Sequence, residues 1–323
     1  MKKLIETNWI RKLISLILTF GIIQLLISLD IINSYLQTTL ATICINIILA
    51  VSLNLITGFT GQFSLGHAGF MSIGAYTCAL ITLRVPSVLG FIIGVFAGAI
   101  MAAIVGFLVG LPTLRLRGDY LAIATLGMAE IIRIIFLNLD SITNGAAGLQ
   151  DIPHFTNWPW LFVFTAGTIL IISNFIKSSH GRACISIRED EIAADAMGIN
   201  STKYKVMAFT IGAFFAGIAG ALYASTFNFI DPKIFSFSKS IDILVIVVLG
   251  GLGSISGSVI AAILLAIITT YLQSFANVQM IIYSLLLIII MIFRPQGLMG
   301  SKELSLSMFS KIGEGFKPKK RRV

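Results

Sequence analysis

The side chains of this chain that could do chemistry are few, because only 11% of its 323 residues are Asp, Glu, Lys or Arg. They gather in a polar segment at residues 177–205, in a glycine-rich stretch near residue 60, and in one charged pair inside an apolar run. No nucleophile–base pair, no pair of carboxylates and no metal-ligand spacing is present. The sequence therefore predicts no catalytic residue and no metal ligand, and it favours binding and movement over catalysis.

The polar segment contains a predicted amphipathic helix. At 100° per residue, residues 189–198 separate into two arcs. The apolar arc consists of Ile192, Ala193, Ala196 and Met197. The acidic arc consists of Asp190, Glu191 and Asp195. Gly198 stands where a left-handed residue would end the helix after about two to three turns.

An apolar arc on a polar segment needs a surface that covers it, either the membrane or a groove on another protein. Membrane-surface helices usually carry Lys and Arg on their polar face, whereas this one carries Asp and Glu, which anionic lipid repels. We therefore favour docking in a protein groove. The alternative is a solvated turn that only ties two membrane spans together.

Two glycine-rich breaks interrupt the apolar sequence, at residues 58–69 and 250–257, and both contain Gly-x-x-Gly-x-x-Ser. Matching interruptions in two halves of a membrane protein are typical of a translocation pathway. Glycine-rich seams also occur where helices simply pack closely. The polar and glycine residues that we place at the pathway or at a subunit interface are Asn54, Gln62, Ser64, His67, Gly250 and Gly253.

Three ionisable side chains lie inside or beside apolar runs. His67 is a candidate pathway ligand, although a lone membrane histidine more often makes an interhelical hydrogen bond. Glu130 and Arg133 are three residues apart and share one helix face. Because a charge at mid-bilayer costs about 2.5–3.5 kcal/mol, this pair should face protein or water. It either lines the pathway or a subunit interface, or forms a buried structural ion pair.

The elements that must position these residues are long apolar helices, since 57% of the residues are hydrophobic and the mean hydropathy is +0.96. Runs of about 17 residues or more, enough to cross a hydrocarbon layer, recur along the chain. They are 13–29, 36–57, 62–83, 88–111, 119–139, 160–176, 206–227, 255–272 and 276–293. A shorter run lies at 241–249. The predicted fold is an all-α polytopic transmembrane helical bundle of ten spans, or of eight if 241–254 is re-entrant or fused to the next helix.

Basic residues predict the orientation of this bundle, whose net charge is +9. Lys and Arg concentrate at the N-terminus, in the polar segment and in the tail at 301–323, while the predicted outer loops at 30–35 and 140–159 carry few. This positive-inside pattern predicts cytoplasmic N- and C-termini and a cytoplasmic polar segment. The basic tail is interpreted as a topology anchor and not as a nucleic-acid site.

Several blocks of the sequence resemble a known family. They are SLNLITGFTGQFSLGHAGFMSIGAY (52–76), LRLRGDYLAIATLGMAEIIRI (114–134), GRACISIREDEIAADAMGIN (181–200), FTIGAFFAGIAGALYA (209–224), VVLGGLGSISG (247–257) and FRPQGL (293–298). In this order they are similar to LivM-type permeases of branched-chain amino acid ABC importers. EIAADAMGIN resembles the loop by which ABC-importer permeases dock on their ATPases. The family more often has glycine where Asn144 stands.

The resemblance implies one permease domain over residues 1–323, in the bacterial cytoplasmic (inner) membrane, with 177–205 as the ATPase-docking loop. The implied partners are a second, LivH-type permease subunit, two cytoplasmic ATPases, an extracytoplasmic solute-binding protein and membrane lipid. The implied substrates are leucine, isoleucine and valine. The implied docking residues are Arg188, Glu189, Asp190, Glu191, Ile192, Ala193, Ala196, Met197 and Gly198, with 188–191 forming a polar rim.

The energy for transport must come from outside this chain, because it contains no Gly-x4-Gly-Lys-Ser/Thr phosphate-binding loop. ATP and Mg²⁺ are therefore expected in the partner ATPases, and this chain is expected to hold no cofactor and to be no enzyme. Two alternatives stay open. One is a permease for urea or short-chain amides, and the other is an ion-coupled secondary transporter, which would need no docking helix.

Overall fold

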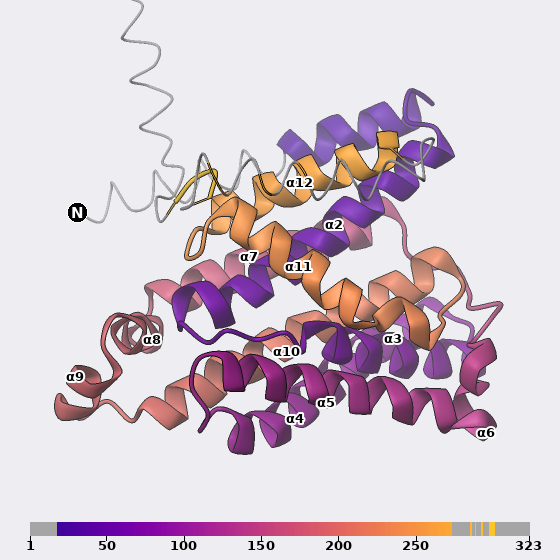
Figure 1. Cartoon of the computed structure of the whole chain (residues 1–323). Coiled ribbons are helices and arrows are strands. Elements are labelled where there is room, and N and C mark those ends of the chain that lie inside the picture. Colours follow the sequence, from indigo (N-terminus) through magenta and orange to yellow (C-terminus); the bar gives the residue numbers. More distant parts are fainter. Residues whose placement is uncertain (1–17, 273–284, 286–287, 289–291, 293–296, 301–323) are drawn as a thin grey trace, which may run out of the picture.

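The computed structural model describes residues 18–272, 285, 288, 292 and 297–300 (Figure 1). Within that part the regular elements are helices, and extended backbone pairs only in a single bridge between Leu149 and Ile230. This confirms the predicted all-α class. Most of the predicted span 276–293 and both termini lie outside the described residues, so their orientation stays a prediction.

Long apolar helices make up most of the chain. Six segments are long and apolar enough to cross a membrane: Ser34–Phe59, Val88–Thr113, Asp119–Asn138, Trp158–Lys177, Ser201–Phe227 and Ile255–Leu272. The first comprises α2 (Ser34–Asn54) and the π-helical turn η1 (Leu55–Phe59), and the others are α4, α5, α7, α10 and α12. Three further helices are Leu18–Ser28, α3 (His67–Arg84) and α11 (Phe237–Gly250). The predicted polytopic bundle is confirmed.

One predicted span boundary is wrong, and one open alternative is excluded. The span expected at 62–83 begins only at His67, because residues 60–66 form a non-helical connection that contains Gly61 at a φ of +73°. The run at 241–249 belongs to a separate helix, α11, so its fusion to α12 is excluded. Its 14 residues extend about 21 Å, which is less than the hydrocarbon thickness of about 30 Å.

The core includes the contacts of α3, α4 and α10, whose backbones approach one another closely at glycine positions. A Cβ atom added at Gly74 of α3 would stand 2.0 Å from the carbonyl oxygen of Gly217 in α10. One added at Gly98 of α4 would stand 2.8 Å from the carbonyl oxygen of Gly74. In a membrane, where lipid competes with hydrophobic contacts, such close approach is a main source of helix–helix attraction.

Short elements gather at the two ends of the bundle (Figure 1). The docking segment, which we define as α8 (Ser179–Glu189) and α9 (Glu191–Ala196), lies at the left end. The turn between α11 and α12 also points to the left, whereas α6 (Asp140–Thr143) lies at the right end. The remaining short elements are η2 (Gly145–Ala147) and η3 (Pro232–Phe235). The bundle therefore separates the docking segment from the loop around α6.

Candidate functional site

The two glycine-rich breaks lie directly against each other. A Cβ atom added at Gly58 in η1 would stand 2.3 Å from the backbone nitrogen of Gly253, in the turn between α11 and α12. Glycine at position 58 permits this approach because it has no side chain. Gly250 serves the same purpose within the second break, where its added Cβ would be 2.6 Å from Gly257. The repeated motif thus marks two segments that meet in space.

Asn54 joins the two breaks through its side-chain amide. Its Oδ1 accepts a hydrogen bond from the backbone nitrogen of Gly253 at 2.9 Å. Its Nδ2 donates to the carbonyl oxygen of Ser254 at 2.9 Å and to the hydroxyl of Ser258 at 2.8 Å. Asn54 is fully buried, so these bonds satisfy an amide that water does not reach. They tie the end of α2 to the α11–α12 turn.

The backbone at this junction is irregular on both sides. η1 is a π-helical turn, a form that occurs often at functional sites. Gly61 and Gly253 have φ values of +73° and +85°, which favour glycine. Irregular backbone is tolerated at membrane depth where protein surrounds it or where it lines a cavity. The junction fits this description, because most of residues 54–66 are buried.

Three predicted pathway residues lie within the first break, and all are buried. His67 makes an interhelical hydrogen bond, with its Nε2 2.8 Å from the hydroxyl of Ser52. Ser64 makes a local contact, accepting from the backbone nitrogen of Gly66 at 3.4 Å. Both polar atoms of the Gln62 amide lack a hydrogen-bond partner among the described residues, as does Nδ1 of His67. A pathway role for these residues stays a prediction.

Glu130 and Arg133 form the expected ion pair on α5. Nε of Arg133 donates to Oε1 of Glu130 at 2.8 Å, and the Nη2 atom contacts the same oxygen. The side chains keep 40% and 21% of their surface exposed, so the described residues bury them only in part. Gly127, one turn earlier, has no atom within 4 Å of an added Cβ. The described residues therefore leave this face of α5 partly uncovered, and the choice between a pathway or interface role and a structural ion pair stays a prediction.

The docking segment consists of two helices, and the single helix predicted over 189–198 is wrong. Asp190 is extended, with φ −157° and ψ 110°, and its Oδ1 accepts from the backbone nitrogens of Ile192 and Ala193. An aspartate in this role caps a new helix and ends the previous one. α9 is consequently only six residues long. Gly198 follows it with φ +82°, the left-handed ending that we predicted.

The predicted apolar arc points away from the protein. Ile192 and Met197 are 74% and 83% exposed, and Ala193 and Ala196 are exposed as well. Ala194, on the other side of α9, is buried. The arc is thus a free apolar surface at the left end of the bundle in Figure 1.

Two acids of the segment fasten it to neighbouring elements. Oε1 of Glu191 accepts from Nζ of Lys205 at 2.6 Å, and Oε2 lies 3.6 Å from Nε of Arg117. Oδ1 of Asp195 accepts from the backbone nitrogen of Ser201, the first residue of α10. Glu191 therefore points toward its own chain, whereas we predicted it in the rim.

Arg188 also departs from its predicted place in the rim, because its guanidinium is directed into the protein. Its Nη1 donates to the carbonyl oxygen of Gly58 at 2.8 Å. Its Nε and Nη2 donate to Oε1 of Glu189 at 3.1 and 2.5 Å. Only 30% of the Arg188 side chain is exposed, against 68% for Glu189. The docking segment is thus bonded directly to the first glycine break.

The family model described as "Branched-chain amino acid transport system / permease component" matches residues 35–293. This range contains almost all of α2, the whole of α3 to α12, both glycine breaks and the docking segment. The chain belongs to this permease family. The names of the relatives of this permease state what those relatives transport.

Curated relatives agree with the family. The permease is 38% identical over 305 residues to "High-affinity branched-chain amino acid transport system permease protein LivM" of Escherichia coli (strain K12), covering 84% of this chain and 71% of the relative. The Salmonella typhimurium protein of the same name is 37% identical with the same coverage. LivH of E. coli K12 is 25% identical over 284 residues, covering 80% and 92%. The LivM-type resemblance is confirmed, and no solved structure gives a significant match.

Some residues of the site were not found from the permease's sequence. Ser254 and Ser258 bind Asn54 although they lie about 200 residues further along the sequence, and no local sequence pattern predicts such a contact. Lys239 and Asp242 lie within α11. Their spacing of three on an apolar helix is the signal that could have revealed them.

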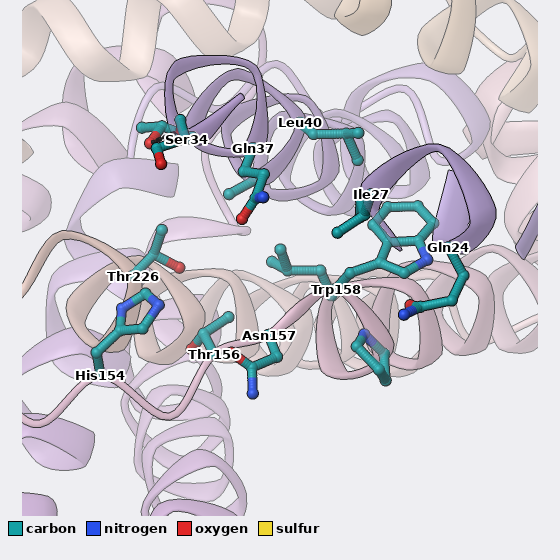
Figure 2. Close-up of a pocket in the computed structure, with 14 residues that line it drawn as sticks. Gln24, Ile27, Ser34, Gln37, Leu40, His154, Thr156, Asn157, Trp158 and Thr226 are labelled. Atoms are coloured by element: carbon teal, nitrogen blue, oxygen red, sulfur yellow. Dashed lines mark hydrogen bonds between the residues drawn. The ribbon is translucent and has the colours of Figure 1, made fainter. Parts of the chain in front are cut away.

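The end of the permease opposite the docking segment holds a pocket of about 580 Å³ (Figure 2). Gln37 extends from α2 into this pocket, opposite Asn157 and Trp158 at the start of α7. Among the described residues that line it, His154 is the one that is ionisable. A Trp side chain such as that of Trp158 is typical of the membrane–water interface.

Proposed function

We propose that this permease is one transmembrane subunit of an ATP-driven importer in the bacterial cytoplasmic membrane, and that it moves leucine, isoleucine and valine into the cell. The names of its relatives support the substrate class, and the family supports the transport role. The observation that carries the proposal is the free apolar arc on α9. It supplies a surface on which a separate motor would act.

ATP hydrolysis belongs to two separate ATPase subunits in this proposal, and ATP and Mg²⁺ bind there. This permease then performs no catalysis. Its α9 presents Ile192 and Met197 to a groove in the ATPase, and burial of two such side chains favours association by about 3–6 kcal/mol before binding costs. Glu189 and Asp190 are exposed beside the arc, so the groove should have a basic border.

A second, LivH-type permease would cover the exposed face of α5. LivM and LivH proteins of E. coli are both similar to this chain, which indicates an importer with two related permeases. The Glu130–Arg133 pair is too costly to leave in lipid. We place it at the interface between the two permeases or in the pathway between them, together with the predicted junction residues.

An extracytoplasmic solute-binding protein would dock at the end opposite α9. The predicted outer loop 140–159 is joined to the segment 228–240 through backbone hydrogen bonds between Leu149 and Ile230 of 2.9 and 3.0 Å. They form one continuous surface as a result. Asn144 adopts φ +55° in it, which explains why glycine suits this position and why asparagine, which tolerates this region, replaces it.

Docking is tested by changing Met197 to Glu in the complex of the permease, its permease partner, the ATPases and the binding protein. A charge in the apolar groove should remove most of the ATPase from the purified complex and lower substrate-stimulated ATP hydrolysis by about tenfold or more. The matched control is Arg115→Gln, at an exposed site in the turn between α4 and α5, outside the docking segment. Hydrolysis unchanged in Met197→Glu would contradict the proposal. Uptake that an uncoupler abolishes while ATP stays high would favour an ion-coupled carrier.

A labelling experiment checks the same surface without disrupting it. The native thiols of Cys44, Cys78 and Cys184 are buried, and burial raises the pKa of the Cys184 thiol to about 11. Cys184 therefore stays protonated and unreactive at pH 7.5. A Met197→Cys variant should react with a maleimide when the permease is alone and be protected once the ATPases bind.

A further inference from the structure

We propose that Arg188 is the positioning residue that transmits movement of the docked α9 to the paired glycine breaks. This inference rests on the proposed function, because it assumes that a motor moves α9. It gives Arg188 a role within the permease and not in the contact with the ATPase.

The contacts of Arg188 connect the exposed side of the docking segment to the first glycine break. Glu189, which is mostly exposed, holds Nε and Nη2 of the guanidinium on the outer side. On the inner side Nη1 donates to the carbonyl oxygen of Gly58 at 2.8 Å. α9 begins at Glu191, directly after the Asp190 cap, so a displacement of α9 reaches Arg188 through two residues of chain.

Glycine makes room for this arginine on both breaks. A Cβ atom added at Gly61 would stand 3.0 Å from Cγ of Arg188, and one added at Gly253 would stand 2.8 Å from its Nη1. The guanidinium is therefore seated between the two breaks, at the point where they already touch. The glycines of the two breaks make room for Arg188 and also permit the irregular backbone.

A movement of Arg188 would be passed on from Gly58 to the residues that contact it. The backbone of Gly58 is packed against Gly253, whose nitrogen is bonded to Asn54, and Asn54 is bonded in turn to Ser258 in α12. The chain of contacts thus runs from the docking segment to α2, α11 and α12. Two closely packed segments such as these breaks are suited to switching between two discrete arrangements.

Arginine is suited to this position because its planar guanidinium donates to a carbonyl and a carboxylate at the same time. Lysine reaches one acceptor well but does not reproduce the two-sided geometry. Lysine at position 188 should therefore preserve only part of the coupling.

The test compares Arg188→Ala and Arg188→Lys with Arg115→Ala, which removes the same charge from an exposed site in the turn between α4 and α5, outside the docking segment. Each variant complex is purified with its ATPases and reconstituted in vesicles, and the ATP hydrolysed per leucine imported is measured. In Arg188→Ala we expect bound ATPase and hydrolysis within about twofold of wild type, while uptake falls about tenfold. Arg188→Lys should lie in between, and Arg115→Ala should equal wild type.

The outcomes separate the inference from the proposed function. A wild-type ratio of ATP to leucine in Arg188→Ala overturns the inference, and so does a parallel loss of ATPase and uptake, which would place Arg188 at the docking contact. If Arg188→Ala fails to fold, Glu189→Gln decides, since it leaves the bond to Gly58 but loosens the guanidinium and should raise the ratio about threefold. An unchanged ratio in that variant also overturns the inference. Absence of ATPases from the wild-type complex would instead refute the proposed function.

Discussion

At the scale of single residues, the buried polar groups of this permease are fixed by specific partners. Asn54 uses three of its hydrogen-bonding positions on the second break, and His67 uses one nitrogen on Ser52. In an environment poor in water an unpaired polar atom is costly, so each bond also selects one arrangement of the helices. The Gln62 amide is one of the exceptions, because both of its polar atoms have no partner among the described residues.

Replacing Asn54 with Leu should destabilise the permease by about 2–3 kcal/mol, because it leaves the Gly253 nitrogen and the Ser258 hydroxyl without their buried partner. The measurement is the thermal midpoint of unfolding in detergent. Asn138→Leu is the matched control, since Asn138 is exposed at the end of α5 and bonds only the Ile134 carbonyl. An equal loss of stability in both variants would show that the Asn54 bonds contribute nothing specific.

At the scale of elements, glycine decides which helices touch. The α3–α4–α10 core has glycines at its backbone contacts, whereas Gly167 in α7 has no atom within 4 Å of an added Cβ. A glycine in a helix costs about 1 kcal/mol relative to alanine unless close packing compensates for it. The glycines of the core therefore act through contact between helices.

Gly74→Ala should separate α3 from α10, because the new methyl group would lie 2.0 Å from the Gly217 carbonyl. We expect a loss of stability of about 2–4 kcal/mol and a lower yield of monodisperse protein on gel filtration. Gly167→Ala should be neutral or slightly stabilising. The packing explanation fails if the two alanine variants behave alike.

At the scale of the whole molecule, the permease is an incomplete assembly. It leaves an apolar arc on α9, a charged pair on α5 and a joined loop surface at the opposite end, which lie in three different places. Each is a surface that the described residues do not cover. The proposed ATPase, second permease and binding protein correspond to them one by one.

Glu130→Ala combined with Arg133→Leu should lower leucine uptake about tenfold, either by weakening the contact with the second permease or by altering the pathway. Co-purification of the second permease distinguishes these two roles. Ile104→Ala, on the exposed face of α4, is the control and should leave uptake unchanged. Normal uptake together with normal assembly in the double variant would remove α5 from both roles.

The helices, the family and the location of the polar segment could all be predicted from the amino-acid sequence. Apolar runs specify membrane helices because every buried backbone group must be bonded within the segment, and this rule is local. The exposed arc and the left-handed Gly198 were likewise predictable, since helical periodicity and a glycine's conformational freedom need no knowledge of neighbours. The break at Asp190 was missed because a capping aspartate and a helical one look alike in sequence.

Only the tertiary structure brought the two glycine breaks together and turned Arg188 toward them. The bonds between Asn54 and the second break join residues 199 to 204 positions apart, and Arg188 reaches Gly58 over 130 positions. Such contacts depend on how all the intervening helices pack, and the close approach of backbones sets that packing. Hydrophobic periodicity along the chain does not predict this packing. The direction in which Arg188 points is therefore set by the assembled bundle.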